Sequence, residues 1–169
     1  TLPGYVFGLM AVYFLQQIKP PVLPVLHELV KVDPKMPGHE HKYLEDLTLL
    51  PEFWQCQNTQ AVGELWVAML RFYSVELDNT TYVISIRQRA LLHRSEKKWA
   101  SKKLAIEDPF HRRRNIARTL SHAQVFEYIN DRLRVAYQYY GIPQTSAGPL
   151  FSDVDQMRLE LRLRDNMRR

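Results

Sequence analysis

The chain has 169 residues, of which 46% are hydrophobic and 11% aromatic, a composition that excludes a wholly disordered chain and suits one domain. The formal net charge is +5, and the sequence-based pI is about 9.4. The single cysteine, Cys56, excludes an internal disulfide and a zinc site built from cysteines, so we expect a reducing compartment, the cytoplasm.

The charge is unevenly distributed along the chain. Residues 1–85 carry five Lys or Arg against nine Asp or Glu, whereas residues 86–169 carry eighteen against nine. We therefore expect the second half to face a polyanion. Nucleic acid is favoured over a membrane because the sequence shows no amphipathic anchor, and a basic face in contact with water alone is the alternative.

The first apolar segment, residues 2–15, contains no charged residue. It is shorter than the ~20 residues that a bilayer-spanning helix needs, and no basic segment precedes it, so neither a membrane span nor a signal peptide is expected. Pro3 precedes apolar residues at helical spacing, and Pro20 and Pro21 follow them. This pattern predicts a helix that ends before residue 20 and is covered on most sides.

Residues 33–58 show little periodicity and contain three prolines and a glycine, which predicts a long surface loop. His39 and His41 flank Glu40 in a pattern that resembles part of a metal site. No further ligand completes the set, so no metal site is predicted there.

A second long helix is predicted, with Asn58 or Thr59 as its N-cap, a clear 3.6-residue apolar repeat from Val62 to Tyr73, and an end at Asp78 and Asn79. It should pack on the first helix. Residues 82–87 alternate as in a half-buried strand, and residues 104–107 are expected to pair with it. The loop between them is basic and contains Arg94, Lys97, Lys98, Lys102 and Lys103.

The stretch LAIEDPFHRRRNIAR, residues 104–118, places two carboxylates beside three consecutive arginines. Because a residue before proline is biased to extended backbone, Asp108 ahead of Pro109 predicts a strand that turns into an ordered loop. Two readings of this loop are open. The charges form an internal ion-pair network, or the arginines face the phosphates of a ligand.

Ser121 and Gln124 form a capping-box pattern ahead of an apolar stripe that ends at Gly141, which predicts a third long helix. Small and turn-forming residues follow it. They predict a boundary between a domain over residues 1–145 and a linker with a basic tail over residues 146–169.

Patterns that carry catalysis are absent from the sequence: it contains no Gly-rich phosphate loop, GxSxG, HExxH or CxxC. Asp153 and Asp155 have the spacing of a metal-binding carboxylate pair, but no glycine-serine turn precedes them. The residues alone therefore predict a mainly helical domain that faces RNA or a nucleotide and has no catalytic or metal-binding residues of its own.

Four segments together resemble a known family. They are similar to the PAP-associated region of the template-independent RNA nucleotidyltransferases, in particular the zinc-knuckle terminal uridylyltransferases, over residues 1 to about 145. The segments are GYVFGLMAVYFLQQIKPPVLPVL from Gly4, GELWVAMLRFYSVEL from Gly63, SIRQR from Ser85, and AIEDPF from Ala105 with the Asn115 and Arg118 that follow.

The resemblance implies the helical central domain of a polymerase-β-like nucleotidyltransferase, mainly α with a small two-stranded β element. It also implies a palm domain, missing from this stretch, that carries three catalytic aspartates. In a complete and active enzyme of this family, the palm binds UTP together with Mg²⁺ or Mn²⁺.

The resemblance also implies roles for single residues. Tyr5 matches the tyrosine that stacks on the uracil, with packing in the first helical turn as the alternative. Glu107 and Asp108 match the nucleotide-recognition loop, Asp108 near the base and Glu107 ordering the loop. Arg114 stands where uridine-selective members have a histidine that contacts the base, and Ala117 stands where they have glycine.

The arginine before Asn115 favours the noncatalytic N-terminal module of these uridylyltransferases, which engages precursor RNA hairpins together with an RNA-binding cofactor protein. LQQIKPPVLPVL resembles the active module equally well, so the UTP-selecting half of an active enzyme that adds uridines to RNA 3′ ends is the alternative. A helical protein-interaction domain with no RNA role is a third reading. In the first reading, RNA phosphates are contacted by Arg112, Arg113, Arg114, Arg118, Arg132 and Arg134.

Overall fold

The computed structural model describes residues 2–30, 42–120 and 122–142. The chain divides into two compact units, Thr1–Tyr137 and Gln138–Arg169, and the contacts considered below lie within the first. The predicted capping residue Ser121, the His39–His41 cluster and the predicted boundary after residue 145 with its tail, 146–169, lie outside the described residues. The boundary therefore stays a prediction.

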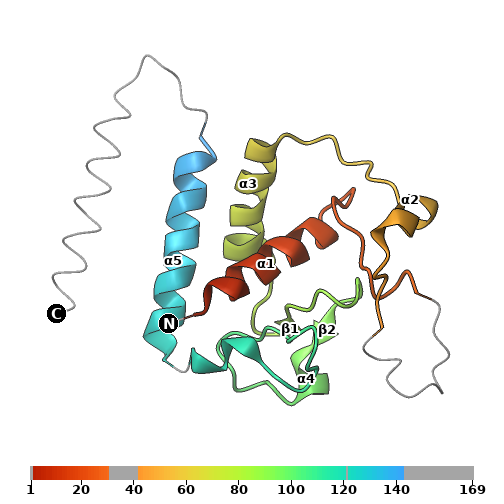
Figure 1. The fold of residues 1–169 in the computed structure, drawn as a ribbon. Helices are drawn as coiled ribbons and strands as arrows, with labels where there is room; N and C mark the ends of the chain where they lie inside the picture. Colours follow the sequence, from red (N-terminus) through yellow and green to blue (C-terminus); the bar gives the residue numbers. More distant parts are fainter. Residues whose placement is uncertain (1, 31–41, 121, 143–169) are drawn as a thin grey trace. The chain divides into compact units, whose positions relative to one another are not determined.

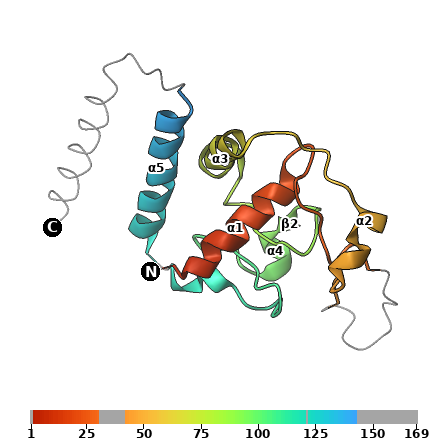
Figure 2. The same cartoon turned by 45° about the horizontal axis from the view of Figure 1, so that its top comes forward.

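Helix α1, Gly4–Gln17, confirms the first predicted helix. Its residues Val6, Leu9, Met10, Tyr13 and Phe14 lie in the main apolar core. Figures 1 and 2 show α1 beside α3, Val62–Arg71, whose Leu65, Ala68 and Met69 pack against that core. The prediction that this helix is covered on most sides is wrong for its first turn. There, Tyr5 and Phe7 are 53% and 50% exposed in the part of the chain that the structure describes.

The N-cap predicted for the second helix is wrong. The cap is Ala61, whose backbone N–H donates to Glu64 Oε2 at 2.7 Å. Asn58 does not cap α3: its side-chain oxygen accepts the Gln60 backbone N–H at 2.9 Å, while its side-chain amide donates to the Pro20 carbonyl at 2.7 Å and so joins this segment to the end of α1. A π-helical turn, Phe72–Glu76, continues α3 and buries Tyr73, whose hydroxyl donates to the Met10 carbonyl at 2.6 Å.

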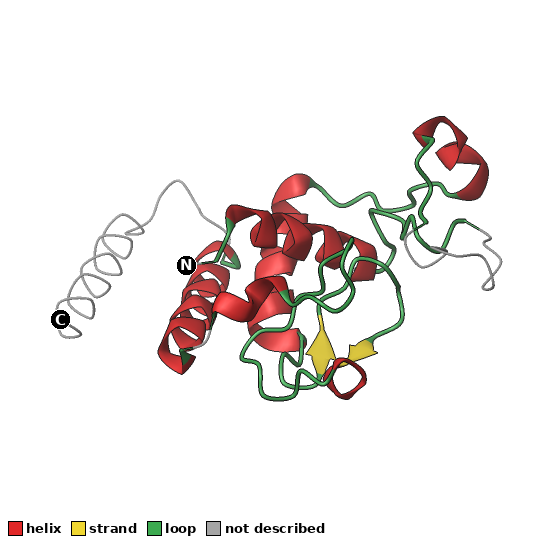
Figure 3. Cartoon of the chain, turned by 60° about the horizontal axis from the view of Figure 1, so that its bottom comes forward, coloured by secondary structure: helices red, strands yellow, loops and turns green. Residues whose placement is uncertain are grey.

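The small β element is confirmed, but its partner strand differs from the prediction. Strand β1, Tyr82–Val83, pairs antiparallel with β2, Leu92–His93, in the register Tyr82↔His93 and Val83↔Leu92. The expected pairing with residues 104–107 is reduced to an isolated parallel bridge between Ile84 and Ile106. Figure 3 shows this short hairpin beside the single turn of α4, Arg94–Lys97.

The third predicted helix is confirmed as α5, Ala123–Tyr140, which follows the 3-10 turn η4, Ile116–Thr119. Its residues Phe126, Ile129 and Leu133 pack against the main core. The remaining short elements, η2 (Leu47–Leu49) and α2 (Leu50–Phe53), lie in the predicted surface loop. Within the described ranges, no helix combines the length and apolar character needed to cross a bilayer.

Candidate nucleic-acid interface

Asn115 organises the base of the loop over residues 104–118. Its side-chain oxygen accepts hydrogen bonds from the backbone N–H groups of Ile106 and Ala117, both at 3.0 Å. Its side-chain amide donates to the Leu104 carbonyl at 2.9 Å. Asn115 is only 5% exposed, so one buried side chain satisfies three backbone groups and closes the loop.

Asp108 shapes the turn that begins the arginine run. One carboxylate oxygen accepts the backbone N–H groups of Phe110 at 2.9 Å and His111 at 3.1 Å, the geometry of an Asx turn. The other oxygen lies 3.7 Å from an Arg114 guanidinium nitrogen and 3.8 Å from His111 Nδ1. Asp108 therefore holds the loop conformation with one oxygen and faces cationic or polar groups with the other.

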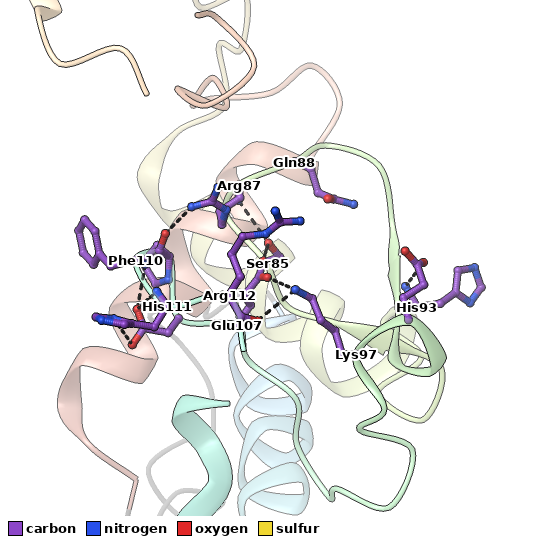
Figure 4. Close-up of polar contacts among 12 residues, drawn as sticks. Ser85, Arg87, Gln88, His93, Lys97, Glu107, Phe110, His111 and Arg112 are labelled. Atoms are coloured by element: carbon purple, nitrogen blue, oxygen red, sulfur yellow. Dashed lines mark hydrogen bonds and ion pairs between the residues drawn. The ribbon is translucent and has the colours of Figure 1, made fainter. Parts of the chain in front are cut away.

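Glu107 lies beneath the loop and is 3% exposed. It accepts a hydrogen bond from the Ser85 hydroxyl at 2.5 Å and forms an ion pair with Lys97 (Figure 4). The Lys97 ammonium also donates to the Arg112 carbonyl at 3.1 Å. One lysine from α4 thus joins a buried carboxylate to the backbone of the arginine run.

Arg87 holds the opposite end of the loop. Its guanidinium donates to the Pro109 carbonyl at 2.5 Å, and Figure 4 shows Arg87 at this end of the loop. The same guanidinium lies 3.4 Å from the Nε2 atom of His27. Burial and, to a smaller extent, the nearby positive charge of Arg87 lower the pKa of His27 to about 4, although Glu107 acts in the opposite direction. His27 is therefore neutral at pH 7 beside a permanently charged arginine.

Tyr5, in the first turn of α1, lies close enough to Asp108 for the two groups to interact electrostatically. Burial raises the pKa of the Tyr5 phenol, and the Asp108 carboxylate raises it further. About half of the side chain, 53%, remains exposed. An accessible aromatic residue of α1 thus lies within the electrostatic influence of the carboxylate at the start of the arginine run, although the two residues are 103 positions apart in the sequence.

Two adjoining hollows lie between the arginine run and the segment that follows β2. The larger has a volume of about 850 Å³, and the smaller about 550 Å³. They share three lining residues, Trp99, His111 and Arg113. The other lining residues are Glu96, Lys97, Lys98, Phe110 and Arg112 in the larger hollow, and Lys102, Arg114, Asn115 and Arg118 in the smaller.

Comparison with known proteins identifies the family of this chain. The family model described as Cid1 family poly A polymerase, the PAP-associated domain, matches residues 61–114. Terminal uridylyltransferase 7 of Homo sapiens is 39% identical over 149 residues, which are 85% of this chain and 10% of that protein. Poly(A) RNA polymerase cid13 of Schizosaccharomyces pombe is 32% identical over 125 residues, 70% of this chain and 22% of that protein.

The fold agrees with the sequence matches. A crystal structure of the Cid1 poly(U) polymerase with MgGTP bound has a TM-score of 0.73 and 28% identity, over 90% of this chain and 46% of that chain. Another Cid1 structure, in complex with the UTP analogue UMPNPP, has a TM-score of 0.71 at the same identity, over 90% of this chain and 49% of that chain. This chain is a PAP-associated region of the Cid1-type terminal uridylyltransferase family. It spans a tenth to a fifth of these curated relatives' lengths and about half of the Cid1 structures.

The resemblance seen in the sequence is therefore confirmed, and so is its implied fold, a mainly helical, Cid1-like region of a polymerase-β-like nucleotidyltransferase with a two-stranded sheet. The relatives include both uridylyltransferases and poly(A) RNA polymerases. This PAP-associated region is thus related to enzymes that act on RNA and add different nucleotides.

The PAP-associated region brings some of the predicted contact residues together and leaves others apart. Arg112, Arg113, Arg114 and Arg118 are exposed and line the two hollows. Arg132 and Arg134 line neither hollow. Both residues lie on α5. The Arg132 side chain is only 25% exposed, forms an ion pair with Asp131 at 2.5 Å and lies 5.1 Å from the centre of the Tyr128 ring. Arg134 is exposed.

The two alternatives for the loop, an internal ion-pair network and arginines that face outward, each describe part of it. The carboxylates of Glu107 and Asp108 take part in an internal network, while three arginines of the loop stand on the surface. Three contacts of the loop were not predicted: Asn115 organises the loop base, Lys97 pairs with Glu107, and Arg87 donates to Pro109. The bias of Asn toward turns was a signal for the first. No sequence signal marked the other two.

His27 makes the stability of this PAP-associated region depend on pH. Because its pKa is about 4 in the folded state and 6.5 in the unfolded chain, the folded state binds fewer protons between these values. The free energy of unfolding should therefore rise with pH from about 4 to 6.5, and this contribution should be complete above pH 6.5.

In the variant His27→Gln, that slope should be smaller, because glutamine does not titrate. Urea unfolding at pH 4.5, 5.5 and 6.5 measures it. His122→Gln, at an exposed position, is the control and should retain the wild-type slope. Parallel pH profiles for wild type and His27→Gln would contradict the prediction.

Proposed function

We propose that the chain is the RNA-recruiting, noncatalytic module of an RNA 3′-terminal uridylyltransferase and acts in cytoplasmic RNA uridylation and processing. One observation carries this proposal: among the residues that the structure describes, seven lysines and arginines and one carboxylate, Glu96, line the two adjoining hollows at the arginine run. Such a concentration of positive charge provides the sequence-independent part of RNA binding. Its partners are RNA 3′ ends or precursor hairpins, a palm domain of the same protein and an RNA-binding cofactor protein.

The two loop carboxylates have a structural role in either case, whether or not the module is catalytic. Glu107 contacts Ser85 and Lys97, and Asp108 accepts two backbone N–H groups, so both order the loop. Within the described ranges, no three His, Cys, Asp or Glu residues come together as a metal site. These residues therefore do not fit Mg²⁺ or Mn²⁺, and we assign the metal and the UTP triphosphate to the complete enzyme.

Salt-dependent RNA binding by the complete protein tests the proposal. Each phosphate contact with single-stranded RNA contributes about 0.7 to the slope of log affinity against log salt concentration. Replacing Arg112, Arg113 and Arg114 together by glutamine should therefore reduce the magnitude of this slope by about 2. A triple variant with the same charge change at exposed positions outside the hollows is the control: Lys19→Gln, Arg89→Gln and Lys103→Gln. Equal slopes for the two triple variants would contradict the proposal.

A second function, the UTP-selecting half of an active uridylyltransferase, is supported by the closeness of Tyr5 to Asp108. In that case Tyr5 stacks on the uracil, Asp108 and Arg114 lie at its edge, and Glu107 orders the loop. Stacking of a base on an aromatic ring contributes about 1–3 kcal/mol, so Tyr5→Ala should weaken UTP binding roughly 5- to 150-fold.

Isothermal titration of the complete protein with UTP measures this change. Phe7→Ala is a suitable control, because Phe7 has a similar exposure, 50%, on the same helix. If both variants bind UTP as the wild type does, this second function is excluded.

A further inference from the structure

The two adjoining hollows, together called the groove, lie between two walls. One wall is the arginine run, and the other is the segment over residues 96–102. The hollows adjoin because Trp99, His111 and Arg113 line both of them. Trp99 is 8% exposed and therefore forms part of the floor rather than the rim.

Both walls have a fixed backbone. Arg94 is 4% exposed, and its guanidinium donates to the carbonyl groups of Tyr82, Lys102 and Lys103, which holds the second wall against the β hairpin. Lys98 has a left-handed backbone conformation, with φ 58°. Its backbone N–H donates to the Ser95 carbonyl at 3.1 Å, so the chain turns there into the groove wall.

The cations of the groove differ in what they already contact. Lys97 is paired with Glu107, and Arg114 lies beside Asp108. Lys98 and Lys102 on one wall, and Arg113 and Arg118 on the other, are exposed. None of these four side chains has a carboxylate partner among the described residues, so their charge remains directed to solvent or to a ligand.

We propose that this groove binds the sugar-phosphate backbone of a single RNA strand, with Lys98 and Lys102 contacting phosphates from the wall opposite Arg113 and Arg118. The inference rests on the proposed function, in which RNA is the ligand, and it assigns a role to two lysines outside the arginine run. A recessed groove with cations on both walls surrounds a single strand, as in other single-strand channels.

Fluorescence anisotropy of the complete protein with a 5′-labelled 15-nucleotide oligouridylate tests the inference. The variant Lys98→Gln with Lys102→Gln removes two phosphate contacts, so the magnitude of the salt slope should fall by about 1.4. Between 50 and 200 mM salt, the affinity of the wild type should then fall about sevenfold more than that of the variant. The control, Lys19→Gln with Lys103→Gln, removes the same charge outside the groove and should retain the wild-type slope.

Two results would count against the groove in different ways. Equal slopes for the two double variants, in a wild-type protein that binds the oligonucleotide, overturn the groove assignment and leave the proposed function intact. If the wild type binds neither the oligonucleotide nor hairpin RNA at any salt concentration, the proposed function and the groove both fail.

Binding of UTP and of duplex RNA by the lysine variant tests whether the ligand of the groove is a single RNA strand. If the variant loses affinity for UTP but not for the oligonucleotide, the phosphates belong to a nucleotide and the inference is overturned. If it loses affinity for an RNA duplex as strongly as for the single strand, the single-strand assignment is overturned. Thermal unfolding should be unchanged, because both lysines are exposed, so any loss of binding reflects the groove itself.

Discussion

Replacing Lys97 by methionine should destabilise the fold by about 3 kcal/mol, because it leaves the buried Glu107 carboxylate without its cation. The methionine preserves most of the side-chain length, so the lost interaction is the ion pair and the hydrogen bond to the Arg112 carbonyl. Urea unfolding followed by circular dichroism measures the change. Lys103→Met, at an exposed position in the same basic segment, should stay within about 0.5 kcal/mol of the wild type.

A double-mutant cycle separates the ion pair from other effects of the lysine. Glu107→Gln removes the charge but keeps a side-chain oxygen that accepts the Ser85 hydroxyl. The combined variant, Lys97→Met with Glu107→Gln, should be more stable than the sum of the single changes predicts, by at least about 1 kcal/mol. If the two changes are additive, or if Lys97→Met matches Lys103→Met, the pair does not hold the loop.

Replacing Asn115 by alanine should be about as damaging, with a loss of at least about 3 kcal/mol. The change leaves two buried N–H groups and one buried carbonyl without partners, and each unsatisfied group costs about 1–3 kcal/mol. The same variant should weaken RNA binding, because Asn115 directly follows the three arginines and its hydrogen bonds anchor that end of the run in the core.

Urea unfolding again gives the measurement for Asn115. The control is Asn130→Ala on α5, where the asparagine is half-buried and the change favours helix, so a shift within about 0.5 kcal/mol is expected. A stability for Asn115→Ala that matches that of Asn130→Ala would contradict the role assigned to Asn115, since it would mean that water satisfies the three backbone groups.

The three long helices were predictable because their signals are local. The apolar repeats behind α1, α3 and α5 depend on residues three or four positions apart, which meet on one helix face in any context. The N-cap of α3 was not predictable in this way. Asn58 is a good capping residue by its chemistry, but in the folded chain its side-chain oxygen accepts the Gln60 N–H and its side-chain amide donates to Pro20, 38 residues earlier.

The basic segment after β2 shows the same limit for the candidate site. Arg94, Lys98 and Lys102 look alike in the sequence, yet Arg94 is buried and binds backbone carbonyls, while both lysines are exposed on a groove wall. Composition predicted that this half of the chain is basic. Only packing decides which cations support the fold and which remain available to a ligand.

The sequence by itself determined the helices, the ordered loop after Pro109 and the family resemblance, because these depend on short-range periodicity, turn chemistry and contiguous motifs. The tertiary structure decided which groups meet: Glu107 with Ser85, 22 residues away, Arg87 with His27, 60 residues away, and Tyr5 with Asp108. The physical reason is that a charge or a hydrogen-bond donor has many candidate partners of equal chemistry along a chain. Burial of the core decides which of them come within bonding distance.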